Sequence, residues 1–211
     1  MATASATDAD PIIFVADDDV SIRDSLSMLF DAASLAYEMF PTGADLLRRM
    51  TGQEVGCILL DYYMPDCNGL ETLKAMRASQ VCLPVIMITA HGDVDLAVQA
   101  MKAGAADFIE KPWKKDQLLG VIKRAVALDR SKRDFAKGQR EASVIIESFT
   151  PREKEVFDEL ITGAPNKVIA RSLDISPRTV EFYRSKVFKK SGSTSVAELV
   201  RLAFVAGLIQ P

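Results

Sequence analysis

The sequence contains no apolar run that is long enough to cross a lipid bilayer. Its longest apolar stretches, residues 81–90 and 202–209, fall well short of the roughly 20 residues that a membrane helix needs. The first ten residues lack both the basic start and the apolar core of a signal peptide. We therefore expect a cytoplasmic protein with no membrane contact, whose residues 1–10 form a disordered tail.

Cysteine is also scarce, with three residues in the chain. Cys57, Cys67 and Cys82 are odd in number, lack a Cys-x-x-Cys spacing and are not joined by a group of histidines. These features argue against a disulfide framework and against a zinc site. We expect the three side chains to be buried apolar residues.

What the chain does have is enough hydrophobic residues for compact cores, and an uneven charge. It has 211 residues, 48% of them hydrophobic and 26% charged, which suits one large domain or two small ones. Residues 1–128 carry 11 Lys and Arg against 18 Asp and Glu, a net charge of −7, whereas residues 150–211 carry 10 against 7, a net charge of +3. Nucleic acid would be repelled by the first part and could bind the last.

From residue 12 onward, short apolar runs alternate with amphipathic helical stretches. The expected strand and helix pairs are residues 12–16 with 21–33, 37–40 with 43–50, 57–60 with 70–78, 84–89 with 94–103, and 106–109 with 115–128. Runs such as residues 58–60 and 85–88 are continuously apolar, as expected for central parallel strands covered on both faces. The sequence therefore predicts a five-stranded, doubly wound parallel sheet of the α/β class over residues 11–128.

Residues 129–149 are rich in mixed charge and are expected to form a helical linker. Only helices follow, over residues 150–211. Thr150 and Glu153 are expected to form a capping box, with Pro151 at the first helical position. Asn166 is expected to cap a short helix, and Ser176 with Pro177 to begin another that runs to about residue 190. With a last helix over residues 195–206, this part is expected to be a separate four-helix domain.

Polar side chains stand where the strands of the predicted sheet end. Asp17, Asp61 and Thr89 each close a predicted strand, and Lys111 follows the last one. In such sheets, ligands bind beyond the carboxyl ends of the strands. We expect these four residues to converge at one edge.

The aspartates at this edge predict a magnesium site. Asp17, Asp18 and Asp19 are consecutive, and such carboxylates beside Asp61 need a cation, for which hard oxygen ligands suit Mg²⁺. Asp18 or Asp19 has an alternative role as the cap of the following helix. Lys111 and Thr89 would supply the positive charge and the hydrogen-bond donor that phosphoryl transfer requires. Singly, they are equally explained as a surface lysine and a strand residue.

Residues 10–130 resemble the receiver domains of two-component response regulators. The motifs that carry the resemblance are Phe-Val-Ala-Asp-Asp-Asp (14–19), Leu-Asp-Tyr-Tyr-Met-Pro-Asp-Cys-Asn-Gly (60–69), Ile-Thr-Ala (88–90) and Asp-Phe-Ile-Glu-Lys-Pro (107–112). The resemblance implies a phosphoacceptor, Asp61, and Mg²⁺, or Mn²⁺ in its place, held by Asp17, Asp18, Asp61 and the backbone carbonyl of Tyr63. Three consecutive aspartates leave this register open by one position, although the spacing to Arg23 favours the first two.

The same resemblance implies roles around the acceptor. Thr89 and Lys111 would contact the phosphoryl oxygens, and the Lys111–Pro112 bond would be cis. Phe108 would be an aromatic switch that follows Thr89, or else an ordinary core residue. His91, the only histidine, is expected to be a loop residue, because in this family the donor histidine belongs to a partner kinase. We further hypothesise that the Tyr63 ring shields the acyl phosphate from water.

The predicted helix at residues 177–190 has two distinct faces. Val180, Tyr183 and Val187 form a core-facing stripe. The opposite face is polar, basic and aromatic, as in the second helix of a helix-turn-helix, although a solvated surface with stray basic residues would look similar. Its members are Arg178, Phe182, Ser185 and Lys189, with Glu181 and Lys186 at the margins.

Residues 149–208 are similar to the LuxR/NarL-type helix-turn-helix, and most of all to its nitrogen-fixation (FixJ) branch. The motifs are Pro-Asn-Lys-Val-Ile-Ala (165–170) and Leu-Asp-Ile-Ser-Pro-Arg-Thr-Val-Glu (173–181). The resemblance implies base contacts from Glu181, Phe182 and Ser185, and backbone contacts from Arg178, Thr179, Arg184, Lys186 and Lys189. It also implies a dimer contact through the last helix, hence inverted half-sites in double-stranded DNA.

These expectations describe a two-state transcriptional regulator rather than an enzyme, since the receiver would only assist its own phosphorylation and dephosphorylation. A sensor histidine kinase would donate the phosphoryl group, the phosphorylated form would be a homodimer, and RNA polymerase is a further expected partner. Inhibition by contact between the domains and activation by receiver dimerisation both remain open. A phosphatase of the haloacid-dehalogenase type is disfavoured because Tyr63 stands where its second carboxylate should be. The other rival is a receiver that serves only as a docking module and never turns over phosphate.

Overall fold

The computed structural model describes residues 10–65, 67–90 and 94–209. Two expectations, the tail at residues 1–10 and the loop position of His91, therefore lie wholly or mostly outside the described residues. The chain divides into two compact units, residues 1–133 and 134–211.

The first unit is built on a parallel sheet of five strands, in the order β2-β1-β3-β4-β5. The strands are β1 (Ile12–Ala16), β2 (Ala36–Phe40), β3 (Gly56–Asp61), β4 (Val85–Thr89) and β5 (Asp107–Glu110). The connecting helices are α1 (Val20–Ala32), α2 (Gly43–Arg49), α3 (Gly69–Ala78), α4 (Val94–Lys102) and α5 (Lys115–Glu147). The predicted five-stranded doubly wound fold is confirmed.

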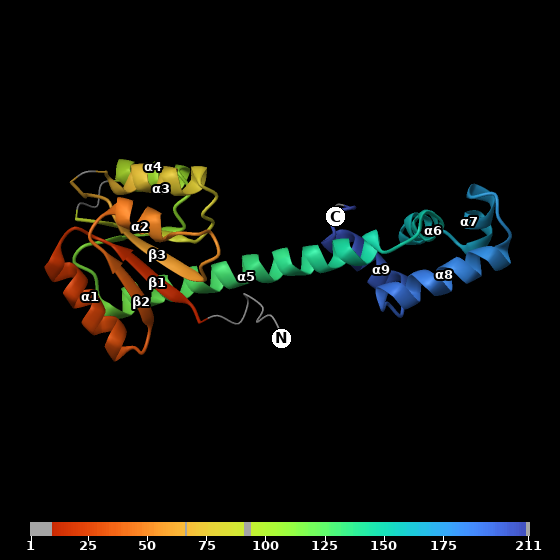
Figure 1. The fold of residues 1–211 in the computed structure, drawn as a ribbon, viewed down its shortest axis with the longest axis horizontal. Helices are drawn as coiled ribbons and strands as arrows, with labels where there is room; N and C mark the ends of the chain where they lie inside the picture. Colours follow the sequence, from red (N-terminus) through yellow and green to blue (C-terminus); the bar gives the residue numbers. More distant parts are fainter. Residues whose placement is uncertain (1–9, 66, 91–93, 210–211) are drawn as a thin grey trace. The chain divides into compact units, whose positions relative to one another are not determined.

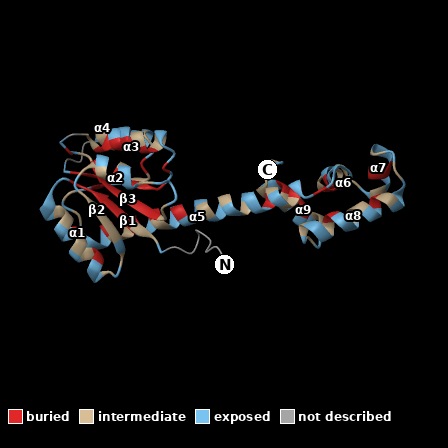
Figure 2. Ribbon diagram, viewed as in Figure 1, coloured by how far each residue is buried: buried red, intermediate tan, exposed pale blue. Residues whose placement is uncertain are grey.

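Helices cover both faces of the sheet, as Figure 1 shows. On one face, α2, α3 and α4 enclose one core with the strands, in which Leu46, Leu73 and Ala100 are buried. On the other face, α1 and α5 enclose a second core, to which Phe30 and Leu118 belong. The central strands β1 and β3 are almost wholly buried (Figure 2), which explains why their sequences are continuous apolar runs.

The helix expected over residues 115–128 and the expected helical linker form one continuous helix, since α5 runs from Lys115 to Glu147. Asp129 is buried on the first unit, where its carboxylate accepts hydrogen bonds from the Gly56 backbone N–H at 3.1 Å and from Arg133 Nε at 2.8 Å. Arg133 also donates to the Glu54 carbonyl. Residues 129–133 of the charged stretch are therefore anchored beneath the start of β3.

The second unit is helical. After the last turns of α5 come α6 (Pro151–Ile161), α7 (Asn166–Ser172), α8 (Pro177–Ser191) and α9 (Val196–Val205). Their core includes Phe157, Ile169, Val180, Val187 and Leu199, all at 1% exposure or less. The core-facing stripe predicted for α8 is confirmed.

The capping residues were predicted well, with one exception. Thr150 and Glu153 form the expected capping box at the start of α6, and Ser176 caps α8. The expected cap at Asn166 is wrong, because Pro165 occupies the cap position of α7 without a side-chain hydrogen bond. Asn166 is instead the first helical residue, and its side-chain oxygen accepts from Arg184 at 3.3 Å.

The cysteines also differ from expectation. Cys57, in the central strand β3, is buried, and burial followed by the nearby Asp129 charge raises the pKa of its thiol to about 12. Cys67 is half-buried and Cys82 exposed, because they lie in loops before and after α3 rather than in the sheet.

Candidate phosphoacceptor site and nucleic-acid interface

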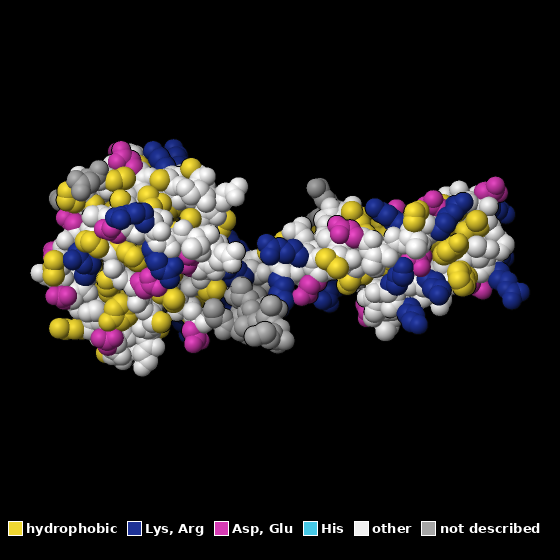
Figure 3. Space-filling view, viewed as in Figure 1, with side chains coloured by type: hydrophobic (Ala, Val, Ile, Leu, Met, Phe, Trp, Pro, Cys, Tyr) yellow, Lys and Arg dark blue, Asp and Glu magenta, His cyan; other side chains and the backbone are white. Residues whose placement is uncertain are grey.

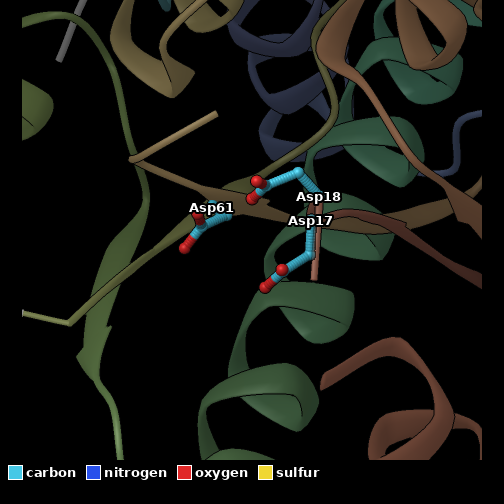
Figure 4. Close-up of side chains that lie close together, drawn as sticks. All are labelled: Asp17, Asp18 and Asp61. Carbon is cyan, nitrogen blue, oxygen red and sulfur yellow. The ribbon is translucent and has the colours of Figure 1, made fainter. Parts of the chain in front are cut away.

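Three carboxylates meet at the carboxyl edge of the sheet. Asp17 directly follows β1, and Asp61 is the last residue of β3, the strand beside it. One carboxylate oxygen from each of Asp17, Asp18 and Asp61 lies within 4.8 Å of the other two. Figure 4 shows the three side chains gathered around one space, from the β1–α1 loop and from β3.

Asp19, the third consecutive aspartate, has a different task. Its side chain accepts a hydrogen bond from the Ser21 N–H at 2.8 Å and so caps α1. The Asp17 side chain in turn accepts from the Asp19 N–H at 2.9 Å, and Arg23 Nη1 donates to the Asp17 carbonyl at 2.5 Å. The cluster and the cap, which were alternatives for this run, are thus divided between its residues.

Lys111 joins the cluster from the end of β5. Its Nζ lies 2.7 Å from Asp17 Oδ2 and 2.9 Å from Asp61 Oδ1, while Lys111 remains 18% exposed. Burial alone would lower the pKa of Lys111, but the hydrogen bonds to Asp17 and Asp61 outweigh it and raise the pKa. The lysine is therefore a fixed positive charge at the acceptor carboxylate.

The positive charge of Lys111 does not fully balance the cost of ionising Asp61 at this site. Burial raises the pKa of Asp61, the Lys111 hydrogen bond opposes this, and the charge of Asp17 raises it again. The net pKa is above its ordinary value, as expected for a buried carboxylate that also has like charges beside it. Hard oxygen ligands in this arrangement fit a small divalent cation, which would relieve that repulsion.

Thr89 and Phe108 belong to the neighbouring strands. Thr89 is the buried last residue of β4, one position beyond Ile88, which is paired with Asp61. The Lys111 N–H donates to the Thr89 carbonyl at 2.7 Å, so the two are linked through the backbone. Phe108 is 39% exposed in β5 and is not the core residue of the alternative interpretation. The Lys111–Pro112 peptide bond is cis, as expected.

Gly69 and Tyr63 shape the loop beyond Asp61. A Cβ at Gly69 would lie 2.2 Å from the Asp61 carbonyl oxygen, so only glycine permits the close start of α3. The Tyr63 ring is half-exposed and packs edge-on against Tyr62, with 4.9 Å between the ring centroids. The sequence motif contained Gly69, but its steric role became visible only in the structure.

In the second unit, α8 presents the predicted mixed face. Six of its eight predicted DNA-contacting residues are exposed: Arg178, Glu181, Phe182, Ser185, Lys186 and Lys189. Figure 3 shows Lys and Arg side chains along this unit with hydrophobic side chains among them. Thr179 is half-buried, and its hydroxyl lies 2.8 Å from that of Ser176.

Arg184 is engaged within the unit. Its guanidinium donates to Asn166 at the start of α7 and lies over the Phe188 ring, 5.3 Å from the centroid. Arg184 therefore ties α7 to α8 in the described structure. The sequence offered no indication of this pair, because Asn166 and Arg184 are 18 positions apart.

Comparisons with known proteins agree with this geometry. Residues 13–123 match the response regulator receiver domain, and residues 147–203 match the bacterial regulatory proteins of the luxR family. The transcriptional regulatory protein FixJ of Bradyrhizobium diazoefficiens is 44% identical over 93% of this chain and 96% of its own length. The chain belongs to the FixJ-like response regulators.

Solved structures are similar over nearly the whole length of this response regulator. The response regulator StyR is 35% identical and has a TM-score of 0.82, covering 93% of this chain and 99% of its own. Full-length FixJ from B. japonicum is 42% identical, with a TM-score of 0.59, covering 95% and 98%. This response regulator is thus a phosphorylation-dependent transcriptional regulator with a receiver and a LuxR-type DNA-binding domain. No helix in its described part is both long and apolar enough to span a membrane.

Proposed function

We propose that Asp61 is the phosphoacceptor of this response regulator. The observation that carries the assignment is the position of Lys111 Nζ, within 3 Å of both Asp17 and Asp61 carboxylates at the carboxyl edge of the sheet. An oxygen of Asp61 attacks the phosphorus of a phosphohistidine on a sensor kinase; the N–P bond breaks as the O–P bond forms. Lys111 then pairs with a phosphoryl oxygen, and Thr89 donates to another.

Asp17, Asp18, Asp61 and the carbonyl of Tyr63 are proposed to hold Mg²⁺, or Mn²⁺ in its place. The bound ion would neutralise charge on the phosphoryl oxygens. The close carboxylates and the raised pKa of Asp61 support a cation at this place. The receiver would assist its own phosphorylation and dephosphorylation and catalyse nothing else.

Phosphorylation is proposed to favour a homodimer. An exposed apolar strip supports receiver pairing: it consists of Val94, Val98 and Met101 on α4 and Phe108 on β5. The Phe108 side chain would rotate with the state of Thr89 and so connect the acceptor to this strip. In the second unit, the exposed Phe204 of α9 supports a further contact between copies.

The second unit is proposed to place α8 in the major groove of DNA with inverted half-sites. Glu181, Phe182 and Ser185 would contact bases, and Arg178, Thr179, Lys186 and Lys189 the backbone. Arg184 would contact the DNA backbone from the position in which its hydrogen bond to Asn166 holds it. We assign residues 11–128 to the receiver, 129–149 to the connection and 150–211 to DNA binding, in a cytoplasmic protein that also contacts RNA polymerase.

The acceptor is tested by incubating the full chain with acetyl phosphate and Mg²⁺ and locating the added phosphoryl group by mass spectrometry of peptides. We expect modification of wild type and of Asp24→Asn, a matched change at an exposed α1 carboxylate, and none of Asp61→Asn. An unmodified wild type, or modification that persists in Asp61→Asn, would contradict the assignment.

The switch is tested with beryllofluoride, a phosphoryl mimic that requires the same site. Oligomeric state and DNA binding are measured with and without it, for wild type and Asp61→Asn. We expect dimerisation and tighter binding in wild type alone. DNA binding should also weaken steeply with added salt, because contacts to phosphates release counterions.

A further inference from the structure

A large apolar side chain stands in the middle of the basic face of α8. Phe182 is 57% exposed, and it shares that face with the exposed residues Arg178, Ser185, Lys186 and Lys189. These positions are four before and three, four and seven after Phe182, so they lie along one side of the helix. Hydrophobic side chains do appear among the basic ones on this unit in Figure 3.

The helix cannot turn to bury this ring. Val180 and Val187 are fully buried on the opposite side of α8, in the core of the unit, and they fix its rotation. The ring is also held laterally, because Tyr183 packs edge-on against it at 5.4 Å between centroids. Lys186 Nζ lies 5.4 Å from the ring centroid, a cation–π contact. Phe182 is thus presented outward in a defined position.

The surrounding charge restricts what can cover the ring. The basic side chains of Arg178, Lys186 and Lys189 favour binding to a polyanion. A polyanion exposes few apolar groups that could cover the Phe182 ring. In the major groove of DNA, the C5-methyl group of thymine is the apolar group that a side chain can contact, and no other base carries one. An aromatic ring embedded in a basic face therefore matches thymine better than any other base.

We propose that Phe182 determines specificity by packing against the C5-methyl group of a thymine in each half-site. The proposal rests on the proposed entry of α8 into the major groove and adds which base the ring selects. Lys186 keeps its ammonium group over the ring and holds the side chain against the methyl. Burying one methyl group in this way should strengthen binding about fourfold per half-site.

The test exchanges thymine for uracil, which removes the methyl group and leaves every hydrogen-bonding group in place. Duplexes that bind the full chain with beryllofluoride are first selected from a random library. Each thymine in one half-site is then replaced by uracil in turn, and dissociation constants are measured for wild type, Phe182→Ala and Phe182→Leu. Val168→Ala is the matched control, because it removes an exposed apolar side chain from α7 of the same unit and leaves α8 unchanged.

We expect one thymine per half-site at which uracil weakens wild-type binding about fourfold. Phe182→Ala should bind the thymine duplex more weakly and show no further loss with uracil, Phe182→Leu should retain part of the difference, and Val168→Ala should retain all of it. Half-sites without thymine, a wild type indifferent to every exchange, or a uracil effect that survives in Phe182→Ala would overturn the proposal. Failure to select any DNA would instead reject the proposed DNA binding itself, while labelling of Asp61 tests the receiver separately.

Discussion

The two functional regions of the molecule use charge in opposite ways. At the acceptor, Asp17 and Asp61 are almost completely buried, and Lys111 is fixed between them by two short contacts. On α8, the basic side chains are exposed and Phe182 stands among them. In the buried cluster, the carboxylates repel one another, and one added cation or phosphoryl group can change that balance. The exposed face of α8 contributes to stability only when a binding partner covers it. The first suits a switch, and the second suits recognition.

The largest expected effect is on stability, and it comes from a substitution in the core of the second unit that should leave the receiver core unchanged. Phe157 is fully buried in the second unit, so Phe157→Ala should destabilise that unit by about 3–5 kcal/mol. The single tryptophan, Trp113, packs on the core of the receiver, so its fluorescence reports receiver unfolding alone. In urea titrations, the helical signal by circular dichroism should gain an earlier transition while the Trp113 transition stays in place.

Phe182→Ala is the control for that experiment, because the ring is exposed and its removal should change stability by less than about 0.5 kcal/mol. If Phe157→Ala moved both transitions equally, the two units would not unfold separately. If Phe182→Ala were as damaging as Phe157→Ala, the ring would belong to the core and not to the recognition face.

The second prediction uses the repulsion in the acceptor cluster. Folding raises the pKa of Asp61, so ionisation of Asp61 favours the unfolded state. The protein therefore loses stability as pH rises through the raised pKa, and it lacks that stability at pH 7. In EDTA, Asp61→Asn should therefore be more stable than wild type. Mg²⁺ at a hundred times its dissociation constant should add about 2.7 kcal/mol to wild type and little to the variant, which reverses the order.

Trp113 fluorescence in urea measures both conditions, and Asp24→Asn, outside the cluster, should respond to Mg²⁺ as wild type does. An equal response of Asp61→Asn and wild type to Mg²⁺ would place the ion elsewhere. A variant less stable than wild type in EDTA would show that the Lys111 contacts outweigh the repulsion.

The two regions also differ in how far the sequence predicts them. The strands of the receiver end within a residue or two of their expected positions, since each apolar run is bounded by polar residues. Asp17, Asp61 and Lys111 could be predicted to meet because parallel strands bring their carboxyl ends to one edge. Which of Asp18 and Asp19 caps α1 could not be predicted, because it depends on backbone geometry at a single turn.

Long-range contacts account for most of what the sequence did not indicate. Residues 129–149 were expected to be helical, but their contacts were not: Asp129 accepts from the Gly56 N–H, 73 positions away, and Ile146 packs in the core of the second unit. Neither partner is visible in the local pattern of residues 129–149. The same holds for Arg184, whose contact with Asn166 replaces the expected cap. On α8, periodicity gave the exposed face but not the arrangement of Phe182, Tyr183 and Lys186 within it.

A smaller effect concerns the ion pair between Glu153 of α6 and Lys190 of α8, in which Glu153 is buried and Lys190 is partly exposed. The hydrogen bond from Lys190, followed by that from the Thr150 backbone, lowers the pKa of Glu153. Such a carboxylate contributes stability above its ordinary pKa, about 4.3, and loses it as pH falls through the lowered value. Glu153→Gln should cost about 1 kcal/mol at pH 7, chiefly through the capping box, since Lys190 is partly exposed and screened.

Circular dichroism in urea at pH 7 and below pH 4 measures this difference, which should shrink in acid. At each pH the Trp113 transition should be the same in Glu153→Gln as in wild type. Arg152→Ala, which removes an exposed pair with Glu155 on the same helix, is the control and should change little at either pH. A Glu153→Gln deficit that is equal at both pH values would mean that packing, and not the charge of Glu153, stabilises this corner.

The smallest effect returns to the acceptor, where an exposed ring stands near a buried charge. Tyr63 is half-exposed two positions after Asp61, and its contact with Tyr62 limits how it can move. If the ring covers the acyl phosphate, Tyr63→Ala should lose its phosphoryl group about threefold faster, an effect of roughly 0.7 kcal/mol on the barrier. Tyr63→Phe keeps the ring and should decay as wild type does. Equal rates for Tyr63→Ala and wild type, followed by mass spectrometry after removal of acetyl phosphate, would show that water reaches the acyl phosphate regardless of this ring, and that the acceptor depends on its buried residues alone.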